Sequence, residues 1–158
     1  MVKDSFLPDS LLEGLPPSPI TVFESLADEI TEKTKGLVVA DVSTERVGDG
    51  FGLELNLYSS SIDYTERILN AFVPYSQYPC QVEIHALGGT RNCESHPELV
   101  ETLVEFTSNP SFLKNLTGLL SMALATPQGR RAMQRAKGAP ISHAPAEDEY
   151  DPFADETQ

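Results

Sequence analysis

The sequence predicts an α+β fold, in which an antiparallel sheet of about four strands packs with helices on one face. Segments with strand-like patterns are contiguous, between residues 37 and 87, whereas helical periodicity comes before and after them. Strands that follow one another directly tend to pair as a meander, and helices segregated from them cover one face. The predicted order is α-β-β-β-β-α-α-α.

Residues 1–17 are predicted to form an irregular arm in front of a single α+β domain at 18–138. Proline removes a backbone donor and fixes φ, which disfavours regular structure. The arm contains three prolines, Pro8, Pro16 and Pro17. Its leucines are candidates for packing on the domain: Leu11, Leu12 and Leu15.

The first helix is predicted to begin at Ser18, because serine is a favoured N-cap and Pro19 suits the first helical turn. Thr21 and Glu24 also have capping-box spacing, which leaves a start at Thr21 open. Apolar residues then recur at helical spacing, at Ile20, Phe23, Ala27 and Ile30. Gly36 is expected to end the helix.

Residues 37–46 and 51–57 are predicted to form an antiparallel hairpin. The first segment is rich in β-branched residues, and Gly48-Asp49-Gly50 between the two is a turn signal. The second segment alternates apolar Phe51, Leu53, Leu55 and Leu57 with polar residues or glycine. One face of this strand is therefore expected to be buried and the other exposed.

Residues 64–73 fit a strand or a helix. Thr65, Ile68, Leu69 and Phe72 would share a helical face, whereas Tyr64, Ile68 and Phe72 would share a strand face. The short connection to the next strand, 80–87, favours a strand and a meander. In that next strand Cys80 is expected to face inward and His85 outward, and Gly88-Gly89 is expected to end the sheet.

Three helices are predicted after the sheet. Their N-caps are expected at Ser95 or His96, at Asn109 and at Thr126, each closely followed by a proline. The first two have apolar stripes for burial, and the third is short and ends near Gly138.

The net charge of −13 is unevenly distributed. Residues 139–158 contain six carboxylates and no Lys or Arg, so they supply −6 and the rest of the chain carries −7. This tail is predicted to be disordered, since it has no apolar periodicity. A net negative chain repels phosphate backbones, so we expect no direct binding of nucleic acid and instead a protein partner with a basic surface.

No stretch of about 18 apolar residues predicts a membrane span, and the first residues lack the basic start and apolar stretch of a signal peptide. We therefore expect a cytoplasmic protein. Its two cysteines, Cys80 and Cys93, are expected to be reduced thiols.

Four residues could together hold zinc by residue type: Cys80, His85, Cys93 and His96. Cys80 and His85 are an odd number of positions apart on one strand, which puts them on opposite faces. Cys93 and His96 could also act as a nucleophile and base, in a flexible polar loop with an exposed cysteine. No residue is marked as a third, orienting member, so we predict no catalytic, cofactor or metal site.

Basic residues cluster near the end of the predicted domain, at Arg130, Arg131, Arg135 and Lys137. The acidic tail with Tyr150 and Phe153 follows directly, and either segment could dock a partner or fold onto the other. Tyr150-Asp151-Pro152-Phe153 resembles the acidic, Phe-ending tails of bacterial single-stranded-DNA-binding proteins. It also resembles the Asp-Pro-Phe peptides that bind clathrin-adaptor ears. Both resemblances imply a short protein-binding motif.

These observations predict a non-enzymatic protein-interaction protein, for example an acidic inhibitor of the immunity or antitoxin kind. Arg130, Arg131, Arg135, Tyr150 and Phe153 are its candidate partner-binding residues. The alternative is a small enzyme or a ligand- or metal-binding module that uses the loop at residues 88–96.

Overall fold

A computed structural model describes residues 6–137 and confirms the α+β class. The predicted disorder of the tail and the candidate residues Tyr150 and Phe153 lie outside the described residues. The elements are α1 (Pro19–Lys33), β1 (Val39–Val47), β2 (Gly50–Ser59), the 3₁₀ turn η1 (Ser60–Ile62), β3 (Tyr64–Pro74), β4 (Cys80–Ile84), β5 (Thr90–Cys93), α2 (His96–Thr107), α3 (Pro110–Leu124) and α4 (Pro127–Ala136).

The sheet is an antiparallel meander of five strands, in the order β1-β2-β3-β4-β5. The prediction of about four strands missed β5, because Gly88-Gly89 does not end the sheet. Both glycines have positive φ, 73° and 74°, and they turn the chain back along β4. Glycine adopts this left-handed conformation without steric cost, so the pair makes a hairpin connection.

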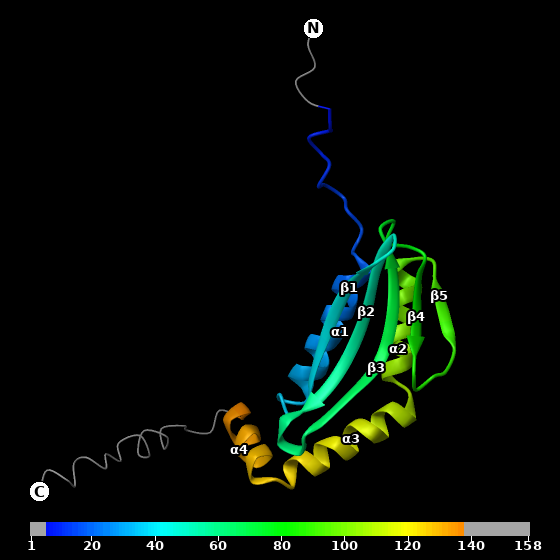
Figure 1. Cartoon of the computed structure of the whole chain (residues 1–158). Helices are drawn as coiled ribbons and strands as arrows, with labels where there is room; N and C mark the ends of the chain where they lie inside the picture. The colour runs from blue at the N-terminus through cyan, green and yellow to red at the C-terminus, as the bar shows by residue number, and fades with distance from the viewer. Residues whose placement is uncertain (1–5, 138–158) are drawn as a thin grey trace, which may run out of the picture.

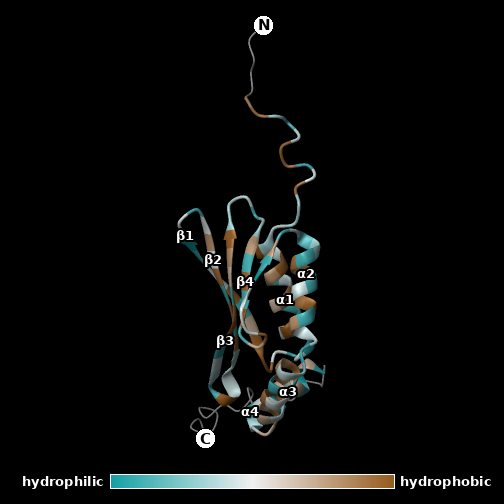
Figure 2. Cartoon of the chain, turned by 90° about the vertical axis from the view of Figure 1, so that its right-hand side faces the viewer, coloured by the Kyte–Doolittle hydropathy of each residue, from teal (hydrophilic) through white to brown (hydrophobic). Residues whose placement is uncertain are grey.

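The helices lie on one face and at one end of the sheet (Figures 1 and 2). Helices α1 and α2 pack against the same face, whereas α3 and α4 run across the end where β2 passes into β3. The opposite face of the sheet has no helix on it in the described part of the chain.

Helix α1 begins where the sequence predicts. The Ser18 side chain accepts a hydrogen bond from the Ile20 backbone N–H at 3.3 Å, so the cap is Ser18 and not Thr21. Its buried face is Phe23, Leu26, Ala27 and Ile30. The helix ends at Lys33, and Gly36, with a φ of 77°, turns the chain toward β1.

The helix-facing side of the sheet forms the core. Leu53, Leu55 and Leu57 of β2 are buried, which confirms the predicted alternation. Their antiparallel neighbours on β3 include Leu69 and Ala71, and β4 adds the side chains of Cys80, Val82 and Ile84.

Strand β3 contains a β-bulge that explains its ambiguous sequence. Leu55 pairs with Leu69 and Asn56 pairs with Arg67, so Ile68 is an extra residue with no partner on β2. A bulge shifts the alternation of side chains by one position. Ile68 and Leu69 are therefore both buried, and the strand predicted for residues 64–73 is confirmed.

The last three helices begin at the predicted caps. Ser95, Asn109 and Thr126 each accept a hydrogen bond from a backbone N–H in the first turn of the following helix. Within residues 6–137, no helix is long and apolar enough to cross a bilayer.

Candidate functional site

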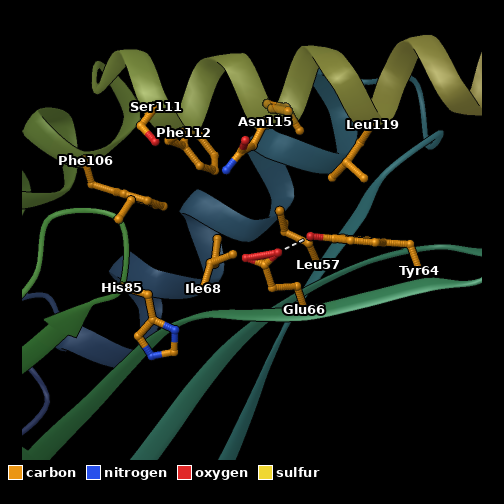
Figure 3. Close-up of a pocket in the computed structure, with 12 residues that line it drawn as sticks. Leu57, Tyr64, Glu66, Ile68, His85, Phe106, Ser111, Phe112, Asn115 and Leu119 are labelled. Atoms are coloured by element: carbon orange, nitrogen blue, oxygen red, sulfur yellow. Dashed lines mark hydrogen bonds between the residues drawn. The ribbon is translucent and has the colours of Figure 1, made fainter.

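A pocket of about 220 Å³ lies between the bulged end of β3 and helix α3 (Figure 3). Half of its lining residues are large and apolar, and they form its walls: Leu57, Ile68, Phe106, Phe112, Leu116 and Leu119. The polar lining residues come from both sides: Tyr64, Glu66, His85, Ser111 and Asn115. Figure 3 shows Asn115 extending from α3 into the pocket, above the Glu66 carboxylate of β3, while Ser111 lies at the other end of the pocket near Phe106.

The bulge determines which way Glu66 points. Beyond Ile68, Glu66 pairs with Leu57, whose side chain belongs to the helix-facing side of β2. Glu66 therefore lies on that side, while Arg67 lies on the open face and pairs with Glu54 at 3.2 Å. The Tyr64 hydroxyl donates a hydrogen bond to Glu66. Burial, followed by this contact, raises the pKa of Tyr64 to about 12, so Tyr64 stays neutral.

The segment at residues 88–96 is not the flexible loop that the sequence predicted. Residues 90–93 form strand β5, and Arg91 donates two hydrogen bonds to Glu105 of α2, at 2.7 and 3.1 Å. The guanidinium lowers the pKa of the Glu105 carboxyl. Arg91 is thus engaged within the domain, and the predicted exposure of Cys93 is wrong, because this residue is 1% exposed.

Cys80 and Cys93 lie directly opposite each other on β4 and β5, and both are free thiols in the core. His85 is exposed beyond the end of β4, and His96 lies at the start of α2. Among residues 6–137, no group of three or more His, Cys, Asp or Glu is arranged to hold a metal ion.

The Cys80 thiol is expected to react slowly in the native protein. Burial, reinforced by the neighbouring Cys93, raises the pKa of Cys80 from 9.0 to about 12. Because the pKa is higher in the folded state, the contribution of this thiol to the free energy of unfolding is fully retained below about pH 9 and falls as the pH rises toward 12. We expect iodoacetamide at pH 8 to label Cys80 far more slowly in native than in guanidinium-unfolded protein, as measured by mass spectrometry. Equal labelling rates would contradict the buried position.

The predicted basic residues on and next to helix α4 are all exposed, and one of them also caps α3. Arg130 donates to the carbonyl oxygens of Leu124 and Ala125, at 3.4 and 3.0 Å, and so caps the end of α3. Arg131 and Arg135 are exposed. Gly129 packs so closely on the Ala123 carbonyl that no side chain fits there, which holds α4 against α3.

The arm at residues 6–17 extends away from the domain (Figures 1 and 2), and its large apolar side chains are exposed. Phe6 is 89% exposed and Leu12 is 80% exposed, and Leu11 and Leu15 are also exposed by half or more. The candidate packing of these leucines on the domain is therefore wrong. Two backbone hydrogen bonds shape the segment into successive turns, from Leu11 N to Pro8 O and from Glu13 N to Ser10 O.

The open face of the sheet is polar and acidic. It carries Asp41, Glu45, Glu54 and Glu83, with Arg67 as a paired cation. Sequence reasoning identified this wet face on β2, whereas it missed the pocket and the exposed arm. The arm had a signal, since its prolines disfavour regular structure and Asp9, Ser10 and Glu13 are interspersed among its leucines.

Comparison with models of known protein families, with curated proteins and with solved structures finds no significant match to this chain. The fold itself defines a class, a five-stranded antiparallel meander with helices on one face and at one end.

Proposed function

We propose that the chain is a non-enzymatic protein-interaction protein whose N-terminal arm docks on another protein. The observation that carries this proposal is the exposure of Phe6, Leu11, Leu12 and Leu15 on a segment that leaves the domain. Large apolar side chains gathered on one exposed segment are typical of an interaction site.

The arm has enough apolar surface to contribute to binding. Burying a Leu or Phe side chain gains about 1.5–3 kcal/mol, so four of them offer about 6–12 kcal/mol. Loss of translational and rotational freedom costs about 4–15 kcal/mol on association. The arm alone therefore supports modest affinity, and tight binding needs further contacts from the domain.

Charge indicates the kind of partner. The arm at residues 6–17 carries Asp9 and Glu13 and no Lys or Arg, and the open face of the sheet is also acidic. Complementary charges steer association and suppress wrong partners. We therefore infer a protein partner with an apolar groove and a basic rim, and we place the pair in the cytoplasm, where Cys80 and Cys93 would remain thiols.

The proposal is tested by crosslinking from the arm. Photo-reactive benzoylphenylalanine in place of Phe6 is expected to crosslink one protein in stoichiometric amount in cells of the source. The same residue in place of Val104, which is 56% exposed on α2, serves as the control position. Once the partner is purified, a variant with serine at Phe6, Leu11, Leu12 and Leu15 is expected to bind it at least about a hundredfold more weakly.

The arm variant is expected to leave the melting temperature unchanged, because its side chains are exposed. Unaltered affinity of this variant for the crosslinked protein would overturn the docking role of the arm. A fall in melting temperature would instead show that the arm packs on its own domain.

A further inference from the structure

We propose that the pocket between β3 and α3 binds a small alkylammonium group, with the charge on Glu66 and the alkyl chain against the apolar walls. This site is separate from the arm and does not depend on the arm's function. The size, the charge and the layout of the pocket all fit such a group.

The size of the pocket limits the ligand to a short chain. Its volume of about 220 Å³ is below the roughly 300–1,000 Å³ of pockets that hold drug-sized molecules. A water molecule occupies about 30 Å³ of liquid, so a ligand of five to ten heavy atoms is a reasonable fit.

The charge of the pocket favours a cation. Glu66 is the only carboxylate among the lining residues, none of them is Lys or Arg, and the ring of His85 is turned away from Glu66 (Figure 3). The nearest arginine in sequence, Arg67, is on the opposite face and pairs with Glu54. Within residues 6–137, Glu66 takes part in neither of the two ion pairs, which are Arg67–Glu54 and Arg91–Glu105.

The layout of the pocket suits a molecule with one charged end. The Tyr64 hydroxyl donates a hydrogen bond to one oxygen of Glu66, which orients the carboxylate and leaves the other oxygen as an acceptor. The α3 side of the pocket carries the Asn115 amide, whose nitrogen is turned toward the pocket (Figure 3). An ammonium has three donors, and because Glu66 is exposed it can donate one to the free carboxylate oxygen and keep the others on water. Buried Phe106 and Phe112 form the apolar end.

Hexylammonium is the probe for this site, with hexanol and hexanoate as matched ligands that lack the positive charge. We expect hexylammonium to shift the NMR signals of Glu66, Ile68 and Asn115 in the full chain, with saturation in the millimolar range. Hexanol is expected to bind more weakly, and hexanoate not at all, because its charge repels Glu66. Binding of hexanoate as strong as that of hexylammonium would overturn the proposal.

The variant Glu66→Gln keeps an acceptor for Tyr64 and removes only the charge. We expect it to weaken hexylammonium binding about three- to tenfold, since the carboxylate is partly screened by water. Glu83→Gln, on the open face of the sheet, is the matched control and is expected to leave the affinity unchanged. Since Glu66 and Glu83 are both exposed, both variants should melt as the parent does. A change of less than twofold on Glu66→Gln would overturn the assignment.

Two sources can supply such a group, a free amine or a lysine side chain of a protein. Nα-acetyl-lysine methylamide distinguishes them, since it carries the same ammonium on a four-carbon chain with a blocked peptide backbone. Tighter binding of this compound than of butylammonium would assign the pocket to a lysine side chain. The reverse order would assign it to a free amine, and binding of neither would overturn the proposal.

Discussion

Replacing Leu55 by Asp is expected to unfold the domain or to reduce its stability severely. Leu55 is 0% exposed and pairs with Leu69 at the centre of the helix-facing side of the sheet. The variant loses about 1.5–3 kcal/mol of apolar burial. It also buries a carboxylate without a partner, at a cost of several kcal/mol, against a total stability of about 5–15 kcal/mol. Thermal unfolding followed by circular dichroism measures the result.

Asn56→Asp is the matched control, since it introduces the same side chain one position along the same strand. Asn56 is half-buried on the open face between Arg67 of β3 and Asp41 of β1, so the new carboxylate has an opposite charge on one side and a like charge on the other. We expect its free energy of unfolding to lie within about 0.5 kcal/mol of the parent. Equal melting temperatures for both variants and the parent would mean that Leu55 is not part of the core.

Much of the fold could be predicted because local signals agreed with one another. Ser18, Ser95, Asn109 and Thr126 cap their helices as expected, since capping depends on a few neighbouring residues. The alternation of apolar and polar residues in β2 could likewise be predicted, because it depends only on which face of the strand is buried.

Features that depend on strand pairing could not be predicted in the same way. Strand β5 is short and polar, and its place in the sheet comes from pairing with β4, as in Cys93 opposite Cys80. Gly88-Gly89 is a hairpin signal as much as a stop, and the sequence does not distinguish the two. The bulge at Ile68 depends on the register with β2, although the adjacent apolar Ile68 and Leu69 are consistent with it.

For the candidate sites, too, local sequence features could be predicted and tertiary contacts could not. The basic cluster on α4 could be recognised from composition. That Arg130 caps α3 could not, because this contact depends on how α4 packs on α3. The pocket could not be predicted, because its walls come from segments that only the tertiary fold brings together. The bulge in β3 turns Glu66 toward the pocket, and the packing of α3 brings Phe112 to it.

Replacing Phe106 by Ala is expected to destabilise the protein and to open the pocket. Phe106 is fully buried at the end of α2, and its ring packs on Phe112 of α3 with centroids 4.4 Å apart. Truncating a buried Phe to Ala costs about 3–5 kcal/mol. For a domain of this size, the melting temperature should fall by roughly 10–15 °C.

Val104→Ala separates loss of packing from any general effect on α2. Val104 lies on the same helix and is 56% exposed, so we expect a change within about 0.5 kcal/mol. Phe106 is also a wall of the pocket, so Phe106→Ala should weaken hexylammonium binding while Val104→Ala should not. Wild-type melting of Phe106→Ala would mean that α3 is not held by this ring pair. The side of the pocket formed by α3, which includes Phe112, would then not be fixed to the rest of the domain through Phe106.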